Sequence, residues 1–115
     1  MYERTLRKHE RILGSNHPDT LITRSNLALA YKMTGDLDRA FPLGERTLTD
    51  YEQNLGSKHP ATLQARSNLA TIYQATGNLS RARSLFEAAL ADCERVLGDA
   101  HPLTQVVRAH LRSFR

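Results

Sequence analysis

The feature that most constrains this chain is an eight-residue motif, Leu-Gly-x-x-His-Pro-x-Thr, which occurs three times at a fixed spacing. Its copies occupy residues 13–20, 55–62 and 97–104, so each begins 42 residues after the one before. The agreement extends beyond the motif, because 23 of the 42 positions in 13–54 hold the same residue in 55–96, without a gap. Such a period is typical of a repeat fold, in which each supersecondary unit stacks on the next.

The composition agrees with a helical repeat. Aromatic residues make up only 6% of the 115 residues, and the length suits a single domain. The formal charge of +4 comes from interspersed acids and bases, so no run of like charge marks a surface for nucleic acid or membrane. No stretch reaches the roughly 20 apolar residues of a membrane span, and the N-terminus lacks the apolar core of a signal peptide.

Glycines and prolines punctuate each copy regularly and predict six helices. A glycine just past a helix end stops the helix, and a proline at the first helical position loses no hydrogen bond. The expected helix ends are marked by Gly14, Gly35, Gly56, Gly77 and Gly98. The expected helices span residues 2–13, 18–33, 37–55, 60–75, 79–97 and 102 onward. Asp36 and Asn78 are expected to cap the second helix of their copies.

The recurring histidines His17, His59 and His101 raise the question of a metal site. They occur once per copy, and packed helices lie about 8–10 Å apart, whereas the ligands of one metal ion lie within a few ångströms of one another. We therefore expect no metal site. Each imidazole is expected instead to cap the helix that begins beside it.

The sequence contains no arrangement typical of catalysis. It lacks a glycine-rich phosphate loop, paired carboxylates on one face and a nucleophile beside a base, so we expect no catalytic residues, no enzymatic activity and no cofactor. The single cysteine, Cys93, excludes an internal disulfide. We expect a buried packing role for it and a reducing, cytoplasmic location for the protein.

The residues that recur within each copy resemble the tetratricopeptide repeat (TPR). The resemblance rests first on Asn-Leu-Ala, which occurs at 26–28 and 68–70. It rests also on the residues that follow at the same spacing in both copies: Tyr31, Gly35 and Ala40 in one, and Tyr73, Gly77 and Ala82 in the next, where Phe86 and Ala89 also fit the pattern. The 42-residue period with its junction motif is similar to the variant found in kinesin light chains. Similar repeats form the C-terminal halves of many bacterial signalling ATPases with numerous domains.

At two places the sequence departs from the family pattern, and these departures change the packing and the groove chemistry that the resemblance implies. Gly44 and Thr47 stand where the pattern expects an aromatic residue and an alanine, which predicts looser packing of that helix. His110 stands where the other copies have Asn26 and Asn68, so the third copy is expected to differ in its groove chemistry.

The resemblance implies an all-α fold, a right-handed α-α superhelix of antiparallel helix pairs with six helices. On this pattern, the single repeat domain 1–115 divides into the end of a truncated unit (1–13), a first full unit (14–55), a second full unit (56–97) and the first helix of a third (98–115). We expect it to be a fragment of a longer array. One helix pair cannot bury its apolar face alone, so stacking builds the core.

The function implied is that of a protein–protein interaction scaffold, in which the first helices of the units line a concave groove for a peptide or partner protein. The expected groove-facing residues are mostly uncharged and polar: Ile22, Ser25, Asn26, Leu29, Lys32, Met33, Gln64, Ser67, Asn68, Thr71 and Gln74. Asn26 and Asn68 are the foremost candidates, because an amide both donates and accepts hydrogen bonds and can pair with a peptide backbone. The alternative is that these amides tie neighbouring helices together.

Arginines recur once per copy, as Arg24, Arg66 and Arg108. They could attract acidic peptides, although we expect them to pair with glutamates of neighbouring helices.

Other interpretations and partners remain open. The chain could be a sensor or regulatory repeat segment of a larger ATP- or GTP-binding regulator, with the nucleotide site outside it. A nucleic-acid-binding module has only the net positive charge in its support. We expect no membrane partner. Self-association through the truncated ends is expected, because apolar residues there would face water; these are Leu6 and Ile12 at one end and Val106, Leu111 and Phe114 at the other.

Overall fold

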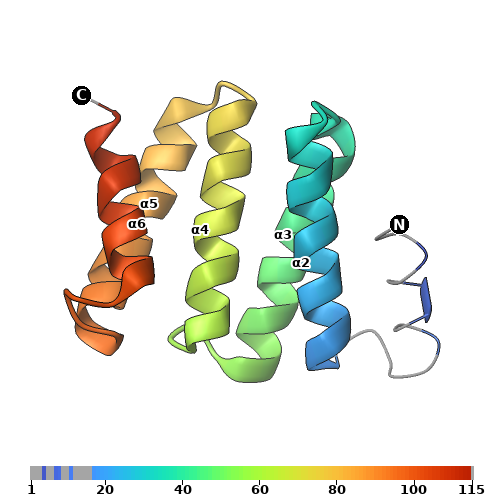
Figure 1. Ribbon diagram of the computed structural model, residues 1–115, viewed down its shortest axis with the longest axis horizontal. Coiled ribbons are helices and arrows are strands. Elements are labelled where there is room, and N and C mark those ends of the chain that lie inside the picture. Colours follow the sequence, from blue (N-terminus) through green and yellow to red (C-terminus); the bar gives the residue numbers. More distant parts are fainter. Residues whose placement is uncertain (1–3, 5–6, 9–10, 12–16, 115) are drawn as a thin grey trace.

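The computed structural model describes residues 4, 7, 8, 11 and 17–114. Its five helices are α2 (Pro18–Met33), α3 (Leu37–Leu55), α4 (Pro60–Ala75), α5 (Leu79–Val96) and α6 (Pro102–Arg112). Figure 1 shows them standing side by side in alternating directions, and no strand occurs in this part of the chain. Each helix packs against its neighbours in sequence, and α2 also contacts α4. The units thus stack as antiparallel helix pairs.

The helix bounds agree closely with those expected from the sequence. The bounds of α2, α3 and α4 match the expected spans, and α5 ends at Val96, one residue early. The helix count differs, because five helices are described rather than six. The expected first helix, residues 2–13, lies largely outside the described residues, as does Gly14.

Histidines cap the first helix of every unit. The imidazole Nδ1 atoms of His17, His59 and His101 accept hydrogen bonds from the backbone N–H two residues later, at 3.1, 3.0 and 3.1 Å. An imidazole nitrogen that carries no proton can accept such a hydrogen bond. The predicted role of these histidines in capping is therefore confirmed.

The turns within and between units rely on glycine. Gly35, Gly56, Gly77 and Gly98 all adopt φ between 84° and 88°, a left-handed conformation that other residues rarely adopt. At the next helix start, the Asn78 side chain accepts a hydrogen bond from the Arg81 N–H at 3.3 Å, as expected for a cap. Asp36 occupies the same position but makes no such hydrogen bond.

A continuous apolar core joins the described helices. Leu21 of α2, Tyr51 of α3, Leu63 of α4, Phe86 of α5 and Val107 of α6 belong to one cluster of buried side chains. Cys93 lies in the same cluster and is fully buried, which confirms its predicted packing role. Burial also raises the pKa of its thiol.

The expectation of loose packing at Gly44 is wrong. A Cβ atom added at Gly44 would lie 3.0 Å from Cδ1 of Ile72 and 3.3 Å from Cδ1 of Leu69, so α3 already approaches α4 closely. The absence of a side chain makes this approach possible, and the two α4 side chains fill the space. Thr47 is buried, and its hydroxyl donates to the Leu43 carbonyl at 2.7 Å.

Candidate peptide groove

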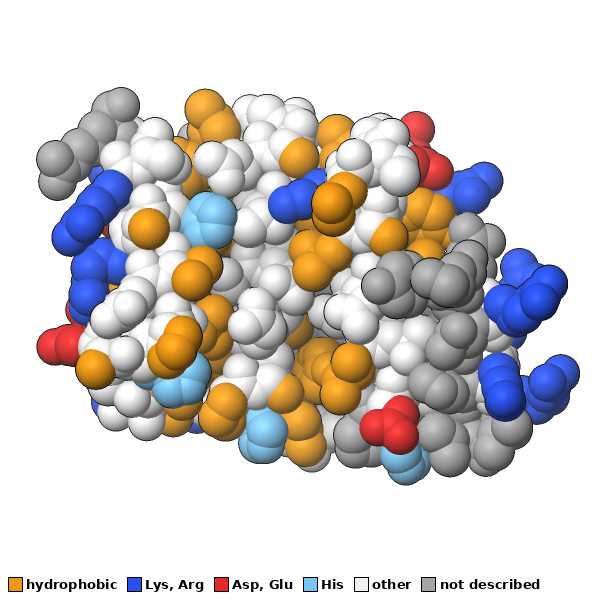
Figure 2. All heavy atoms as spheres, viewed as in Figure 1, with side chains coloured by type: hydrophobic (Ala, Val, Ile, Leu, Met, Phe, Trp, Pro, Cys, Tyr) orange, Lys and Arg blue, Asp and Glu red, His pale blue; other side chains and the backbone are white. Residues whose placement is uncertain are grey.

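The helices α2, α4 and α6 present one broad face of the molecule. Figure 2 shows hydrophobic and uncharged atoms filling the middle of this face, while most Lys and Arg side chains stand at its edges. The expected groove residues come from α2 and α4, the first helices of the two full units. An uncharged surface of this kind suits contacts with a peptide backbone and small apolar side chains.

A pocket of about 180 Å³, which we call the central groove pocket, lies between α2 and α4. Five of the expected groove residues line it together: Ile22, Ser25, Asn26, Gln64 and Asn68. Tyr51, Ala61 and Ala65 complete the lining. Tyr51 comes from the second helix α3, and sequence reasoning missed it because the equivalent positions hold His9 and Cys93. Burial raises the pKa of the Tyr51 phenol.

The two asparagines of the repeated motif are placed differently. The Asn68 amide donates to the Ser25 hydroxyl at 3.2 Å and accepts from the Gln64 amide at 3.0 Å. Because Ser25 belongs to the preceding unit, Asn68 links α4 to α2. Asn26 is exposed, and its side chain makes no hydrogen bond to any other described residue. The amide of Asn26 is therefore open to a partner, whereas that of Asn68 already joins two helices.

The other expected groove residues differ in exposure. Met33 is 82% exposed and Ile22 is 52% exposed, so both offer apolar surface. Ser67 is only 3% exposed and offers almost none of its side chain to a partner. The remaining members are half-buried: Leu29, Lys32, Thr71 and Gln74. The Thr71 hydroxyl donates to the Asn68 carbonyl at 2.7 Å, within its own helix.

The row of groove positions continues onto α6. A second pocket of about 240 Å³ is lined by Val106, Ala109, His110 and Ser113. These four residues lie one period after Gln64, Ser67, Asn68 and Thr71. The groove residues expected from the sequence come from α2 and α4 only, although the 42-residue period places these α6 residues at equivalent positions.

His110 replaces the motif asparagine in this third copy. Its ring stacks on Phe86 with the centroids 4.9 Å apart and the planes inclined by 9°. Burial, together with the positive charge of Lys32, lowers the pKa of His110. The neutral imidazole thus serves as an aromatic wall of the α6 pocket.

The recurring arginines form ion pairs inside the stack. The pairs are Arg24 with Asp50, Arg66 with Asp92 and Arg108 with Glu94. The arginines pair with acidic residues of neighbouring helices, but the expectation of glutamate partners holds only for Arg108 and for a longer contact of 3.5 Å between Arg66 and Glu52. The closest partners of Arg24 and Arg66 are aspartates. Arg24 and Arg66 are buried, so these guanidinium groups are held within the stack and do not form an open cationic surface.

Metal binding and membrane insertion are two further properties to consider for the described part of the chain. No group of three or more His, Cys, Asp or Glu side chains there could hold a metal ion. None of the helices described combines the length and apolar character that crossing a bilayer requires.

Comparisons with known proteins agree with this geometry. Two family models, both of the tetratricopeptide repeat, match residues 1–53 and 62–103. A comparison with curated protein sequences gives no match.

Similar solved structures include the nearly identical TPR-like repeats of a protein from Podosopora anserina described as a kinesin light chain, and a single-substitution variant of the same repeats. Both have a TM-score of 0.89, with 29% and 28% sequence identity. Each alignment covers 97% of this chain and 53% of the other, so the chain spans about half the length of these structures. The expected superhelix of antiparallel helix pairs is confirmed, and the chain belongs to the tetratricopeptide repeat family, with repeats like those of kinesin light chains.

Proposed function

We propose that this chain is a protein–protein interaction module that binds an extended peptide along the face of α2, α4 and α6 and has no catalytic activity of its own. The observation that carries the proposal is the row of pockets at period-related positions. The central groove pocket lies between α2 and α4. The pocket on α6 includes Val106 and His110, which stand one period after Gln64 and Asn68 of the central groove pocket. A peptide in extended conformation could contact both.

The chemistry of the row suits a peptide main chain. The exposed Asn26 amide can donate to a peptide carbonyl and accept from a peptide N–H. Ile22 and Val106, which are 52% and 49% exposed, flank the polar groups and offer apolar surface for peptide side chains. Polar groups that fix orientation within a mostly apolar lining are typical of binding sites.

The test begins with a random peptide library selected on the wild-type protein. The selected peptides are then titrated against Asn26→Ala, whose side chain is exposed and whose loss should leave the fold intact. We expect binding to weaken by about 1–2 kcal/mol, the loss of one or two hydrogen bonds. The matched control is Asn54→Ala, an exposed asparagine on α3. Equal binding by wild type and Asn26→Ala would refute the groove assignment.

The same titrations separate a peptide partner from nucleic acid. Phosphate contacts make affinity fall steeply with salt concentration, whereas an uncharged groove predicts a shallow dependence. No observation on the described residues favours a regulatory segment of a larger ATP- or GTP-binding regulator over the interaction module. We also propose a cytoplasmic location, which the single buried Cys93 supports.

Self-association is a further part of the proposal. Val106 of α6 is half-exposed, and Leu111 and Phe114 are only partly buried at the same end of the stack. Exposed apolar surface of this kind favours association. Leu6 and Ile12, the candidates at the other end, lie outside the described residues. Light scattering at increasing concentration should show growth in mean mass, and a constant monomer mass would refute this part.

A further inference from the structure

The central groove pocket contains a polar group that the fold does not use. Tyr51 is only 4% exposed, yet its hydroxyl makes no hydrogen bond with another described residue. The hydroxyl is also not sealed from solvent, as those of Thr20 and Thr104 are. Because Tyr51 belongs to α3, which lies behind the face that α2 and α4 form (Figure 1), the part of it that reaches the pocket is the far end of its ring. A polar group in such a place is expected to find its partner in a ligand.

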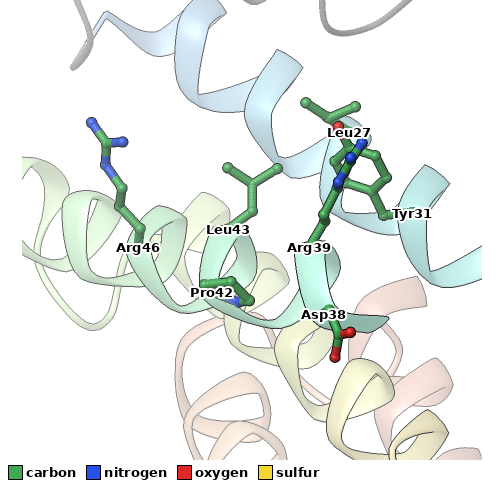
Figure 3. Close-up of a pocket in the computed structure, with 7 residues that line it drawn as sticks. All are labelled: Leu27, Tyr31, Asp38, Arg39, Pro42, Leu43 and Arg46. Atoms are coloured by element: carbon green, nitrogen blue, oxygen red, sulfur yellow. The ribbon is translucent and has the colours of Figure 1, made fainter. Parts of the chain in front are cut away.

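The cavity in Figure 3 is of a different kind. It has a volume of about 430 Å³ and lies between α2 and α3, with Leu27, Tyr31 and Leu43 in its lining. In the next unit, α3 covers the equivalent surface, and Phe41 meets Tyr73 edge-on there. That surface is therefore one on which helices of the stack pack, whereas the central groove pocket lies on the groove face between two neighbouring units.

The side chains around the Tyr51 hydroxyl offer both donors and acceptors. The phenol is a donor at neutral pH, because burial raises its pKa above the ordinary value of about 10. The Gln64 amide nitrogen donates to Asn68, which leaves the Gln64 carbonyl oxygen able to accept. Asn26 is exposed, and its amide can donate and accept. The walls between these polar groups are apolar: Ile22, Ala61 and Ala65.

A primary amide matches this arrangement. Its carbonyl oxygen can accept from Tyr51 while its NH2 group donates to Gln64 or Asn26. A carboxylate brings acceptors only, and an aliphatic side chain would leave the Tyr51 hydroxyl buried without a partner, which is unfavourable. The Arg24 guanidinium, whose charge acts on the Tyr51 phenol, already pairs with Asp50, so it does not require an acidic ligand.

The size of the pocket agrees with such a ligand. A volume of about 180 Å³ gives room for about six water molecules, since each takes about 30 Å³ in the liquid. The side chains of asparagine and glutamine fit a space of this size.

The junction between α4 and α6 does not repeat this arrangement. One period after Tyr51 and Ala61 stand Cys93, which has no hydroxyl, and Leu103, which is larger and buried. Recognition of an amide is therefore expected at the first junction alone, so a bound peptide needs only one such residue.

We propose that the central groove pocket recognises the side-chain amide of a glutamine or asparagine in the bound peptide, with Tyr51 as the residue that determines this specificity. The carbonyl oxygen of the peptide side chain accepts from the Tyr51 hydroxyl, and its NH2 group donates to Gln64 or Asn26. This inference rests on the proposed function, because it names the residue that the groove selects in its peptide.

Peptide pools provide the first test. Each pool fixes its central residue as Gln, Asn, Glu or Leu and leaves the neighbouring positions random. We expect the wild-type protein to retain the Gln and Asn pools more strongly than the Glu and Leu pools. In the strongest binder from the Gln pool, replacing the central Gln by Leu or Glu should weaken binding by about tenfold, as expected for lost hydrogen bonds to buried groups.

A conservative variant of the protein provides the second test. Tyr51→Phe removes only the hydroxyl and should leave stability unchanged, because that hydroxyl has no partner among the described residues. We expect this variant to bind the Gln peptide about three- to tenfold more weakly and the Leu version as the wild type does. The matched control is Tyr73→Phe, which removes a hydroxyl that donates to Glu45 outside the pocket and should bind the Gln peptide normally. In NMR spectra of the wild type, this peptide should shift the side-chain amide resonances of Asn26 and Gln64.

The outcomes separate this inference from the groove itself. If no pool binds, the proposed function fails and the amide pocket fails with it. If the pools bind equally well, or if Tyr51→Phe weakens the Gln and Leu peptides alike, the groove stands and the amide pocket is overturned.

Discussion

The guanidinium of Arg66 lies 2.8 Å from the carboxylate of Asp92, and this ion pair joins the two helices of the second unit. Both side chains are largely buried, at 9% and 14% exposure. The same arginine also donates to the Ser57 carbonyl at 3.2 Å, in the turn that begins the unit. One side chain therefore links α4, α5 and the junction between units.

Arg66→Ala should destabilise the fold, because it removes the only largely buried partner among the three described ion-pair partners of the Asp92 carboxylate. The other two, Lys58 and Arg95, are mostly exposed. We expect the free energy of unfolding to fall by about 2–4 kcal/mol, as when one member of a buried pair is removed. Urea denaturation of wild type and variant measures the difference.

Arg95 provides the matched control, because it pairs with the same carboxylate from a position that is 64% exposed. Exposed ion pairs contribute at most about 1 kcal/mol, so Arg95→Ala should change stability little. If the two variants are equally destabilised, burial is not what makes the Arg66 pair important.

The histidine caps should contribute measurably to stability. His59 accepts a hydrogen bond from the Ala61 N–H, and this bond is lost in His59→Ala. We expect a cost of about 1 kcal/mol, typical of a lost cap. His59→Asn should recover most of it, since asparagine is a strong capping residue. Thermal or urea unfolding of the two variants checks the order, and an Asn variant as unstable as the Ala variant would argue against the cap.

The sequence predicts the local features of this fold well because their causes are local. The caps at His59 and Asn78 and the stop at Gly77 depend on a few residues around each turn, and the repeat presents them more than once. The period also aligns the copies without ambiguity. The helix bounds could therefore be predicted before the structure, whereas the arginines were expected to pair with glutamates and two of them pair with aspartates.

Features that depend on contacts between units could not be predicted in the same way. Asn26 and Asn68 occupy the same motif, yet only Asn68 meets a serine of the preceding unit, Ser25. Similarly, the effect of Gly44 depends on Ile72, in the next unit, and no pattern within one copy reveals that the two meet. The same residue at the same repeat position thus acquires its role from its neighbour in the stack.

Gly44→Ala should destabilise the interface between the units. The added methyl group would lie 3.0 Å from Cδ1 of Ile72, and overpacking of this kind costs about 1–3 kcal/mol. Alanine is favoured over glycine within a helix by about 0.5–1 kcal/mol, which offsets part of the cost. We expect a net loss of about 1 kcal/mol in urea denaturation.

The double variant Gly44→Ala with Ile72→Val identifies the cause. Valine lacks the Cδ1 atom that the new methyl group would meet, so the two changes together should cost less than the sum of the single changes. A coupling energy of about 0.5 kcal/mol or more is expected for residues in contact. Additive effects would show that the contact does not limit the approach of α3 to α4.

The last prediction concerns the dependence of stability on pH through His110. Burial against Phe86, together with the charge of Lys32, lowers the pKa of His110 in the folded state. In the unfolded chain the imidazole takes up a proton near its ordinary pKa of about 6.5. The unfolded state therefore binds more protons than the folded state below this pH. The stabilisation is present above about pH 6.5 and is lost as the pH falls toward the lower folded pKa.

The variant His110→Asn isolates the contribution of His110, because the wild type and the variant share all the other histidines. Asparagine is the residue that the other two copies carry at this position. We expect the wild type to lose more stability than the variant when urea denaturation is repeated at about pH 7.5 and about pH 5.5, on either side of the ordinary histidine pKa. At the higher pH the variant should be the less stable of the two, because it lacks the ring stacked on Phe86. Equal losses of stability on acidification would mean that His110 has the same pKa in the folded chain as in the unfolded chain. The stack on Phe86 would then not hold the imidazole in its neutral form.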